Sequence, residues 1–456
     1  MKKIILLVIL LFSVSALANS KVTKIKDLIQ KTDPHINVGI KIKNLDKNII
    51  IYQQNIHRYF TFASGLKFIT LITLLEELGK NYPFTSSISK FNDDYYLDIH
   101  DPEFSTQDLE QLILSLKSNN INSIKGNFYI VNKDFLVTPL IPTKTVNDTM
   151  RCYGALITRL HINKNCSRIN VAATEIGKKA LLSNVEFVPY EIENNVITTQ
   201  DNNIQSINAI ITDNKYIASG TIKESNESSI IGAVTHNHFE NVALILSHLL
   251  EKHDIKLLNG KILTSQSSNN AEIIAVKNNN FFTIVSNAMK KSDNFVTDYL
   301  LAEASSINED LIKELGNRPM EWCDTTKLLK QLVHKHTGVD INLSSIEDGS
   351  GISRLNYLTV AQIDQILEAI SKKTNFLEIL SILATPGEEG TLKNRYTKNT
   401  KLYAKTGTLT GVTSLLGYFH NKKGELNSFV IVINNIHGSL GKFKLLEDDI
   451  ISLLAN

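Results

Sequence analysis

The segment from Ser64 to Gly79, SGLKFITLITLLEELG, constrains the fold of this chain more than any other segment. Apolar residues occupy nearly every face of the helix that it predicts, so this helix must be buried on all sides. Strands are predicted before it, in INVGIKIKNLDKNIIIYQQN around a turn at 44–46, and again near the end of the chain, in KLYAKTGTLTGV and TSLLGYFHNKKGELNSFVIVIN. We therefore expect the two ends of the chain to form one antiparallel sheet.

The middle of the chain divides into two regions of different pattern. Residues 86–270 carry short apolar alternations such as GNFYIVN and SINAIITD between polar clusters, which indicates a β-rich insertion. Residues 279–380 turn to helical patterns, as in FFTIVSNAMKK and TTKLLKQLVHKH, and the closing KFKLLEDDIISLLAN predicts a packed terminal helix. We expect a split α/β domain, made of 19–85 and 271–456, that is interrupted by β-rich subdomains over 86–270.

The first residues, MKKIILLVILLFSVSALANS, predict export. Two lysines, a short apolar run and Ala16-Leu17-Ala18 form the pattern of a cleaved signal peptide over 1–18, and an uncleaved membrane anchor is the alternative. An exported chain can hold disulfides, and a bond between Cys152 and Cys166 would close a short loop. Cys323 is left over, and its position beside Trp322 predicts a buried thiol.

Charge and motif content exclude several classes of function. The formal net charge is +2, without a basic tail, so there is no electrostatic reason to expect a nucleic-acid partner. The sequence has no Cys-x-x-Cys, no His-Glu-x-x-His and no Gly-rich phosphate loop. We expect neither a metal nor a cofactor.

Three short motifs follow one another along the chain: Ser-x-x-Lys at 64–67, Ser-Asp-Asn at 292–294 and Lys-Thr-Gly at 405–407. Each alone is weak evidence, because Ser-x-x-Lys recurs at 87–90 and 439–442, and Ser64 could be an ordinary helix cap. Only the match at Ser64 opens a buried helix, and Lys405 lies inside a predicted strand. The ordered set is typical of penicillin-binding proteins and class A β-lactamases.

The chemistry of acyl transfer gives each motif residue a role. A serine hydroxyl is a poor nucleophile until a base takes its proton, and Lys67, one helical turn after Ser64, faces the same side. A lysine acts as a base only if desolvation or a like charge lowers its pKa, and Lys405 could supply that charge. Ser292 can relay a proton to the departing amine, and Asn294 can hold Lys67 and a substrate amide.

The third motif has the groups to bind the substrate. Lys405, Thr406 and Thr408, on the strand that includes Gly407, present a cation and hydroxyls to a substrate carboxylate. The backbone N–H groups of Ser64 and Thr408 are natural donors to an oxyanion.

On these residues the chain resembles the class C low-molecular-mass penicillin-binding proteins, the type 4 group of D-alanyl-D-alanine carboxypeptidase/endopeptidases. The resemblance covers nearly all of the mature chain, and this family also inserts extra domains between the first two motifs. It rests further on KKSDN (290–294), GVDINLSSIEDGSGISRLN (338–356), ATPGEEGTLKNR (384–395) and AKTGTLTGV (404–412). It implies an α/β (α+β) penicillin-recognising, transpeptidase-like domain, with a five-stranded antiparallel sheet flanked by helices and β-rich inserted domains.

The resemblance also implies a function and two further site residues. The expected activities, in the periplasm, are acylation by penicillin, removal of the terminal D-alanine from peptidoglycan stem peptides, and cleavage of D-alanyl-diaminopimelate cross-links. It places Asp148, in NDTMRC, at the free end of diaminopimelate and Arg354, in SGISR, in the same cleft. The chain departs from the family at Val146, where an aromatic residue is expected, and at Thr410, where relatives can carry an amide.

Two other functions are open at this point. A serine β-lactamase of class A needs a glutamate-bound water, and no Glu-x-x-x-Asn lies between the second and third motifs. A catalytically idle cell-wall binding protein would have lost Ser64, Lys67 or Lys405, and all three are present. The expected partners are peptidoglycan peptides and β-lactam antibiotics, while peripheral membrane association and a homodimer stay open.

Overall fold

The structure is a computed structural model that describes residues 21–200, 206–226, 228–267, 270–396 and 401–455. The predicted signal peptide, 1–18, lies outside the described residues. The chain forms two compact units. The first comprises the residues up to Gly79 with Val285–Thr297 and Glu321–Asn456, and the second comprises Lys80–Ile284 and Asp298–Met320.

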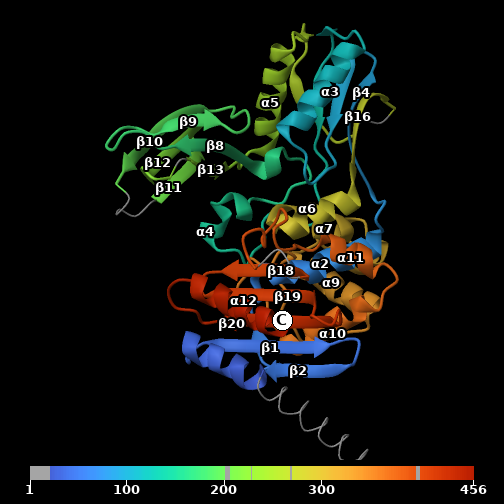
Figure 1. The fold of residues 1–456 in the computed structure, drawn as a ribbon. Coiled ribbons are helices and arrows are strands. Elements are labelled where there is room, and N and C mark those ends of the chain that lie inside the picture. The colour runs from blue at the N-terminus through green and yellow to red at the C-terminus, as the bar shows by residue number, and fades with distance from the viewer. Residues whose placement is uncertain (1–20, 201–205, 227, 268–269, 397–400, 456) are drawn as a thin grey trace, which may run out of the picture. The chain divides into compact units, whose positions relative to one another are not determined.

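The first unit is built on the five-stranded antiparallel sheet that the two chain ends were expected to form (Figure 1). Its strand order is β18-β19-β20-β1-β2, with every neighbouring pair antiparallel. The strands are β1 (Asn37–Asn44), β2 (Ile49–Gln54), β18 (Leu402–Leu409), β19 (Val412–His420) and β20 (Leu426–Asn434). All of β19 except its last residue is buried, so both faces of the sheet are covered.

Helices supply the cover on both faces. The terminal helix α12 (Gly441–Ala455) and the helix over residues 21–32 share one core with the sheet, in which Ile25 and Phe443 are fully buried. Helix α10 (Val360–Ser371) packs against β20 and β1, and the Tyr418 hydroxyl donates to the Leu367 carbonyl over 2.7 Å. The fold prediction of a sheet flanked by helices is therefore confirmed.

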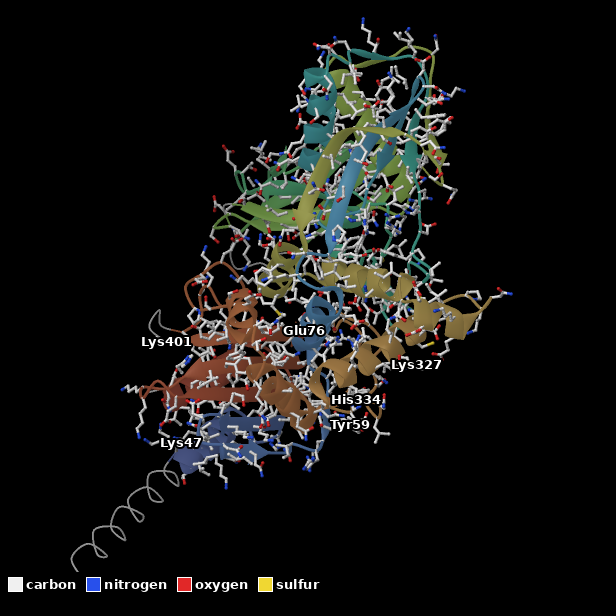
Figure 2. The ribbon with its side chains drawn as sticks, turned by 90° about the vertical axis from the view of Figure 1, so that its right-hand side faces the viewer. Lys47, Tyr59, Glu76, Lys327, His334 and Lys401 are labelled. Carbon is white, nitrogen blue, oxygen red and sulfur yellow. A yellow bond between two sulfur atoms is a disulfide. The ribbon has the colours of Figure 1, made fainter. Side chains whose placement is uncertain are left out.

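Helix α2 (Leu66–Leu78) is the predicted all-apolar helix. Every residue from Leu66 to Leu75 is buried, as its sequence required. In its last turn Glu76, labelled in Figure 2, accepts from Lys373 and Asn375, each over 2.7 Å. The helix is therefore a rigid element, and the residues just before it are held by its burial.

The other predicted helices of the first unit are present too. They are α6 (Phe281–Lys291), α7 (Asn294–Ser306), α9 (Trp322–Thr337) and α11 (Phe376–Ile382), of which α6 and α7 extend into the second unit. The predicted burial of the Cys323 thiol is wrong. Trp322 turns into the core at the start of α9, whereas Cys323, the next residue around the helix, is exposed.

The second unit contains three larger sheets. A five-stranded sheet has the order β15-β7-β5-β4-β16 and two three-stranded sheets have the orders β10-β12-β11 and β13-β8-β9. The strands of the first are β4 (Pro83–Phe91), β5 (Asp94–Asp98), β7 (Phe128–Val131), β15 (Ile262–Ser265) and β16 (Glu272–Asn280). Those of the other two are β8 (Cys166–Ala172), β9 (Leu181–Asn184), β10 (Glu191–Thr199), β11 (Ser206–Thr212), β12 (Lys215–Lys223) and β13 (Ser228–Val234).

Two long helices of this unit were not predicted. Helices α3 (Thr106–Ser118) and α5 (His238–Lys252) pack on the five-stranded sheet through one core that includes Leu112 and Ile245. The signal for α3 was present, since Ser105 and Asp108 form a reciprocal capping box before an amphipathic run. The unit also takes in Asp298–Met320, which the sequence-based division placed in the split domain.

Candidate active site

Ser64 lies in a single 3-10 turn, Ala63–Gly65, that leads into α2. The Phe62 carbonyl stabilises this turn and attaches it to β19, because it accepts from the Gly65 N–H over 3.0 Å and from the Ser414 hydroxyl over 2.6 Å. The N-cap of α2 is Gly65, and no side chain caps either the turn or the helix. Ser64 is therefore not a helix cap, and its half-buried hydroxyl is available for chemistry.

Lys67 is completely buried on the first turn of α2. Its ammonium group donates to Ser64 Oγ over 2.8 Å, to the Ser350 carbonyl over 2.6 Å, and to Asn294 Oδ1. Three acceptors fix one side-chain rotamer, so the nitrogen is held against the Ser64 hydroxyl. This distance is within the reach of a general base.

The Ser-Asp-Asn motif occupies the break between α6 and α7. Ser292 has a φ of 60°, a left-handed conformation that costs about 1–3 kcal/mol for a residue other than glycine. Asp293 accepts from the Val296 N–H over 3.1 Å and so caps α7, which places Asn294 at the helix start beside Lys67. The left-handed conformation of Ser292 and the cap by Asp293 together place Ser292 and Asn294 beside the two buried lysines.

Lys405 is the second completely buried lysine, and it lies on β18. Its ammonium group donates to Ser292 Oγ and to the Thr406 carbonyl, each over 2.8 Å. Burial, followed by the positive charge of Lys67, holds the pKa of Lys405 well below its usual range. Repulsion between like charges is reciprocal, so a charge on either lysine disfavours a charge on the other.

The strand β18 lies against the serine turn at Gly407. A Cβ atom at this position would lie 2.3 Å from the Phe62 carbonyl oxygen and 2.3 Å from Ser414 Oγ. Only glycine permits this approach, which brings the edge of β18 beside Ser64. Thr406 is buried and Thr408 is exposed on the same strand.

Sequence reasoning missed the loop that supplies the Ser350 carbonyl. The buried carboxylate of Asp348 accepts from the Gly351 N–H over 2.6 Å, from the Ser353 N–H over 2.7 Å and from Asn356 Nδ2 over 2.9 Å. Gly351 has a φ of 82°, and a Cβ there would lie 2.0 Å from the Ala63 carbonyl oxygen. The pair Gly349 and Gly351 in DGSG was the available signal for a tight turn.

Residues 21–453 match the model of the D-Ala-D-Ala carboxypeptidase 3 (S13) family. The chain belongs to this family. It is therefore a serine-type carboxypeptidase, and the S13 assignment confirms the resemblance inferred from the motifs.

Individual relatives match over most of their length. This S13 enzyme is 26% identical over 444 residues to the D-alanyl-D-alanine carboxypeptidase DacB of Haemophilus influenzae, covering 93% of this chain and 90% of that protein. The crystal structure of penicillin binding protein 4 (dacB) from Haemophilus influenzae superposes with a TM-score of 0.76 at 23% identity, covering 95% of this chain and 99% of that one. Bd3459, a predatory peptidoglycan endopeptidase from Bdellovibrio bacteriovorus, superposes with a TM-score of 0.51 at 12% identity over 92% of each chain. These structures share the fold.

Asp148 lies in the second unit of the S13 enzyme and already has a local role. Its carboxylate accepts from the Thr145 hydroxyl over 2.6 Å and from the Tyr153 hydroxyl over 3.0 Å, and it caps the short helix α4 (Val146–Thr149). Arg354 lies in the first unit, is exposed, and donates to the Thr410 carbonyl over 3.4 Å.

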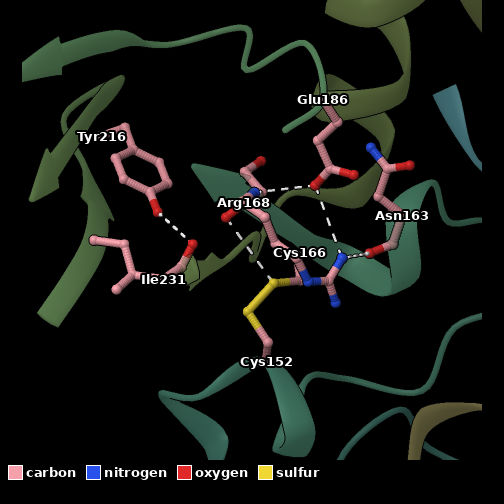
Figure 3. The surroundings of a disulfide bond; sticks show 8 residues. Cys152, Asn163, Cys166, Arg168, Glu186, Tyr216 and Ile231 are labelled. Carbon is pink, nitrogen blue, oxygen red and sulfur yellow. Dashed lines mark hydrogen bonds and ion pairs between the residues drawn. A yellow bond between two sulfur atoms is a disulfide. The ribbon is translucent and has the colours of Figure 1, made fainter. Parts of the chain in front are cut away.

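Cys152 and Cys166 form a disulfide in the second unit, with their Cα atoms 5.4 Å apart (Figure 3). The bond joins the turn after α4 to the first residue of β8. Gly232 packs on it so closely that a Cβ would lie 2.5 Å from Cys152 Sγ. No helix in the described part of the chain is long and apolar enough to span a membrane.

Proposed function

We propose that this S13 enzyme, located in the periplasm, removes the terminal D-alanine of peptidoglycan stem peptides and cleaves D-alanyl-diaminopimelate cross-links. Both reactions would pass through an acyl-enzyme on Ser64, and penicillin would acylate the same residue. One observation carries the proposal: each serine of the site accepts a hydrogen bond from its own buried lysine. Lys67 donates to Ser64, and Lys405 donates to Ser292.

Acylation begins when Lys67, in its neutral form, takes the proton of the Ser64 hydroxyl. Ser64 Oγ then attacks the carbonyl carbon of the penultimate D-alanine, and the N–H groups of Ser64 and Thr408 stabilise the oxyanion. The departing amine receives a proton through Ser292. Water later attacks the ester and gives a proton to neutral Lys67, and Lys67 then returns a proton to Ser64 Oγ as it leaves.

Recognition of the substrate falls to β18 and to residues outside the serine site. Lys405, Thr406 and Thr408 would bind the terminal carboxylate of the substrate through a cation and two hydroxyls. The resemblance to the type 4 group assigns Asp148 and Arg354 to the free end of diaminopimelate. That resemblance is the support for the endopeptidase activity.

The test is a penicillin adduct mapped by mass spectrometry of peptides. The wild-type enzyme should carry the adduct on the peptide that contains Ser64, and Ser64→Ala should carry none. Ser87→Ala and Ser439→Ala are matched controls because each serine also precedes a lysine by three positions. An adduct on either control serine, or none on the wild type, contradicts the site. Rapid loss of the adduct would indicate a β-lactamase instead.

A further inference from the structure

A cavity of about 340 Å³ lies within the second unit, apart from any residue used in the mechanism. Its walls come from the first turns of α3, the last turns of α5 and the segment 185–187. This volume is at the lower end of the range for small-molecule sites. The cavity therefore has room for one compact ligand.

One wall is aromatic. Phe187 and His248 stack face to face with ring centroids 3.7 Å apart and an interplanar angle of 4°, and both line the cavity. Each ring covers one face of the other, and both rings are half-buried. The parts of the rings that line the cavity offer dispersion contacts to the C–H groups of a ligand.

The remaining walls are polar without an excess of charge. Glu110 is paired with Lys252 over 2.7 Å and with His253 over 2.8 Å. Glu186 accepts from the Arg168 backbone N–H over 3.0 Å and lies 3.8 Å from its guanidinium. Since each carboxylate already has a basic partner, the cavity suits a neutral ligand rather than an ion.

Glu186 can act both as donor and as acceptor. Burial raises the pKa of Glu186 to about 7, so a large share of its carboxyl groups is protonated at neutral pH. A carboxyl of this kind suits hydroxyl groups, which also both donate and accept. An aromatic wall beside such groups is complementary to a sugar, which has both C–H groups and hydroxyls.

The wall that bears Glu186 is rigid before any ligand arrives. Figure 3 shows Arg168 beside Glu186 and Asn163, and Arg168 donates to the Asn163 carbonyl over 3.4 Å. Arg168 follows Cys166 on β8, where the disulfide to Cys152 fixes the strand. A preformed wall lowers the entropy lost on binding.

We propose that this cavity binds a neutral saccharide, so that the inserted unit holds the glycan strand whose peptides the other unit cleaves. The inference that the ligand is a saccharide depends only on the residues that line the cavity. The inference that this saccharide is part of peptidoglycan depends on the proposed function.

The test uses the tetramer of N-acetylglucosamine, which has no peptide, with the full mature enzyme in isothermal titration calorimetry. The wild type and Ser64→Ala should bind it equally. Phe187→Ala and Glu186→Ala should weaken binding at least tenfold and leave the rate of penicillin acylation unchanged. Phe91→Ala, an exposed phenylalanine of the same unit, is the matched control and should bind as the wild type does.

Two results would overturn the proposal: no binding by the wild type, or equal binding by Phe187→Ala. Glycan strands that keep their stem peptides, so that each lactyl carboxyl is a neutral amide, should compete with the tetramer for Ser64→Ala if the natural ligand is the cell-wall polymer, and failure to compete would overturn that assignment. The penicillin adduct on Ser64 is scored separately. Saccharide binding without an adduct therefore contradicts the proposed function, and an adduct without binding contradicts this site.

Discussion

Lys405 Nζ donates to Ser292 Oγ over 2.8 Å, which joins the third motif to the second although 113 positions separate the two residues. The bond links the edge strand β18 to the strained break between α6 and α7. Each serine of the site therefore has its own buried lysine as a hydrogen-bond donor.

Ser292→Ala should slow acylation by penicillin about 10²–10⁴-fold, because it removes a proton relay and leaves the nucleophile in place. Stopped-flow measurement of adduct formation tests this, with Ser286→Ala in α6 as the matched control. The adduct should still form on Ser64. An unchanged acylation rate would exclude Ser292 from proton transfer.

Lys67→Met should raise the pKa of Lys405 because it removes the neighbouring positive charge. The pKa should remain below the usual lysine value, since burial is the larger cause of its depression. Titration of ¹³C-labelled lysine by NMR measures the change. Lys327→Met, at an exposed position of α9, should leave the pKa of Lys405 unchanged. An unchanged Lys405 pKa in Lys67→Met would refute the coupling between the two lysines.

Gly351→Ala should reduce both stability and acylation. Its φ of 82° resembles that of Gly424, 77°, but only at Gly351 would the new Cβ meet backbone, 2.0 Å from the Ala63 oxygen. Gly424→Ala should cost roughly 1–2 kcal/mol from the left-handed conformation alone and keep full acylation. Urea unfolding and acylation rates compare the pair. Equal effects of the two variants would mean that the loop does not position Ser64.

Glu447 should make the stability of the first unit fall as the pH rises. It is fully buried on α12, and burial raises its pKa to about 7 although Arg395 donates to it over 2.9 Å. Its neutral form is favoured in the folded state, so its contribution is fully present below the unfolded pKa, near 4.5, and is lost as the pH rises to about 7.

Glu447→Gln should remove most of this pH dependence, which amounts to about 3 kcal/mol in the free energy of unfolding between pH 4.5 and about pH 7. Thermal unfolding between pH 4 and 8 measures it, and Asp449→Asn, exposed on the same helix, should keep it. A Glu447→Gln profile that parallels the wild type would show that Glu447 does not cause the slope.

Asp148→Asn should slow cleavage of a diaminopimelate cross-linked dimer about tenfold or more, since a hydrogen bond to a charged group is worth about 1.5–3 kcal/mol. Penicillin acylation should not change. Thr145→Val removes the hydroxyl that Asp148 accepts but keeps the carboxylate, so it isolates the capping role. Assays on the dimer should separate the two variants, and equal losses would assign Asp148 to the cap of α4 alone.

The sequence was informative wherever the signal is local. The periodicity around Ser64, the strand pattern at Lys405 and the helical pattern after 279 each depend on a few neighbouring residues, and each predicted element is present. Helix α3 was missed although its capping box was visible, because its region had been assigned as β-rich from the alternations on either side. The disulfide pair was a candidate by spacing, whereas the exposure of Cys323 depends on which side of α9 faces the core.

By itself, the sequence determined the residue types of the site and their order along the chain, because a motif of three or four residues is readable without a fold. Only the tertiary structure decided that Lys67 contacts the Ser350 carbonyl and that Gly407 approaches the Phe62 carbonyl. These contacts join distant segments through backbone atoms, which are the same at every residue. Their positions therefore follow from packing, and the sequence pattern alone does not reveal them.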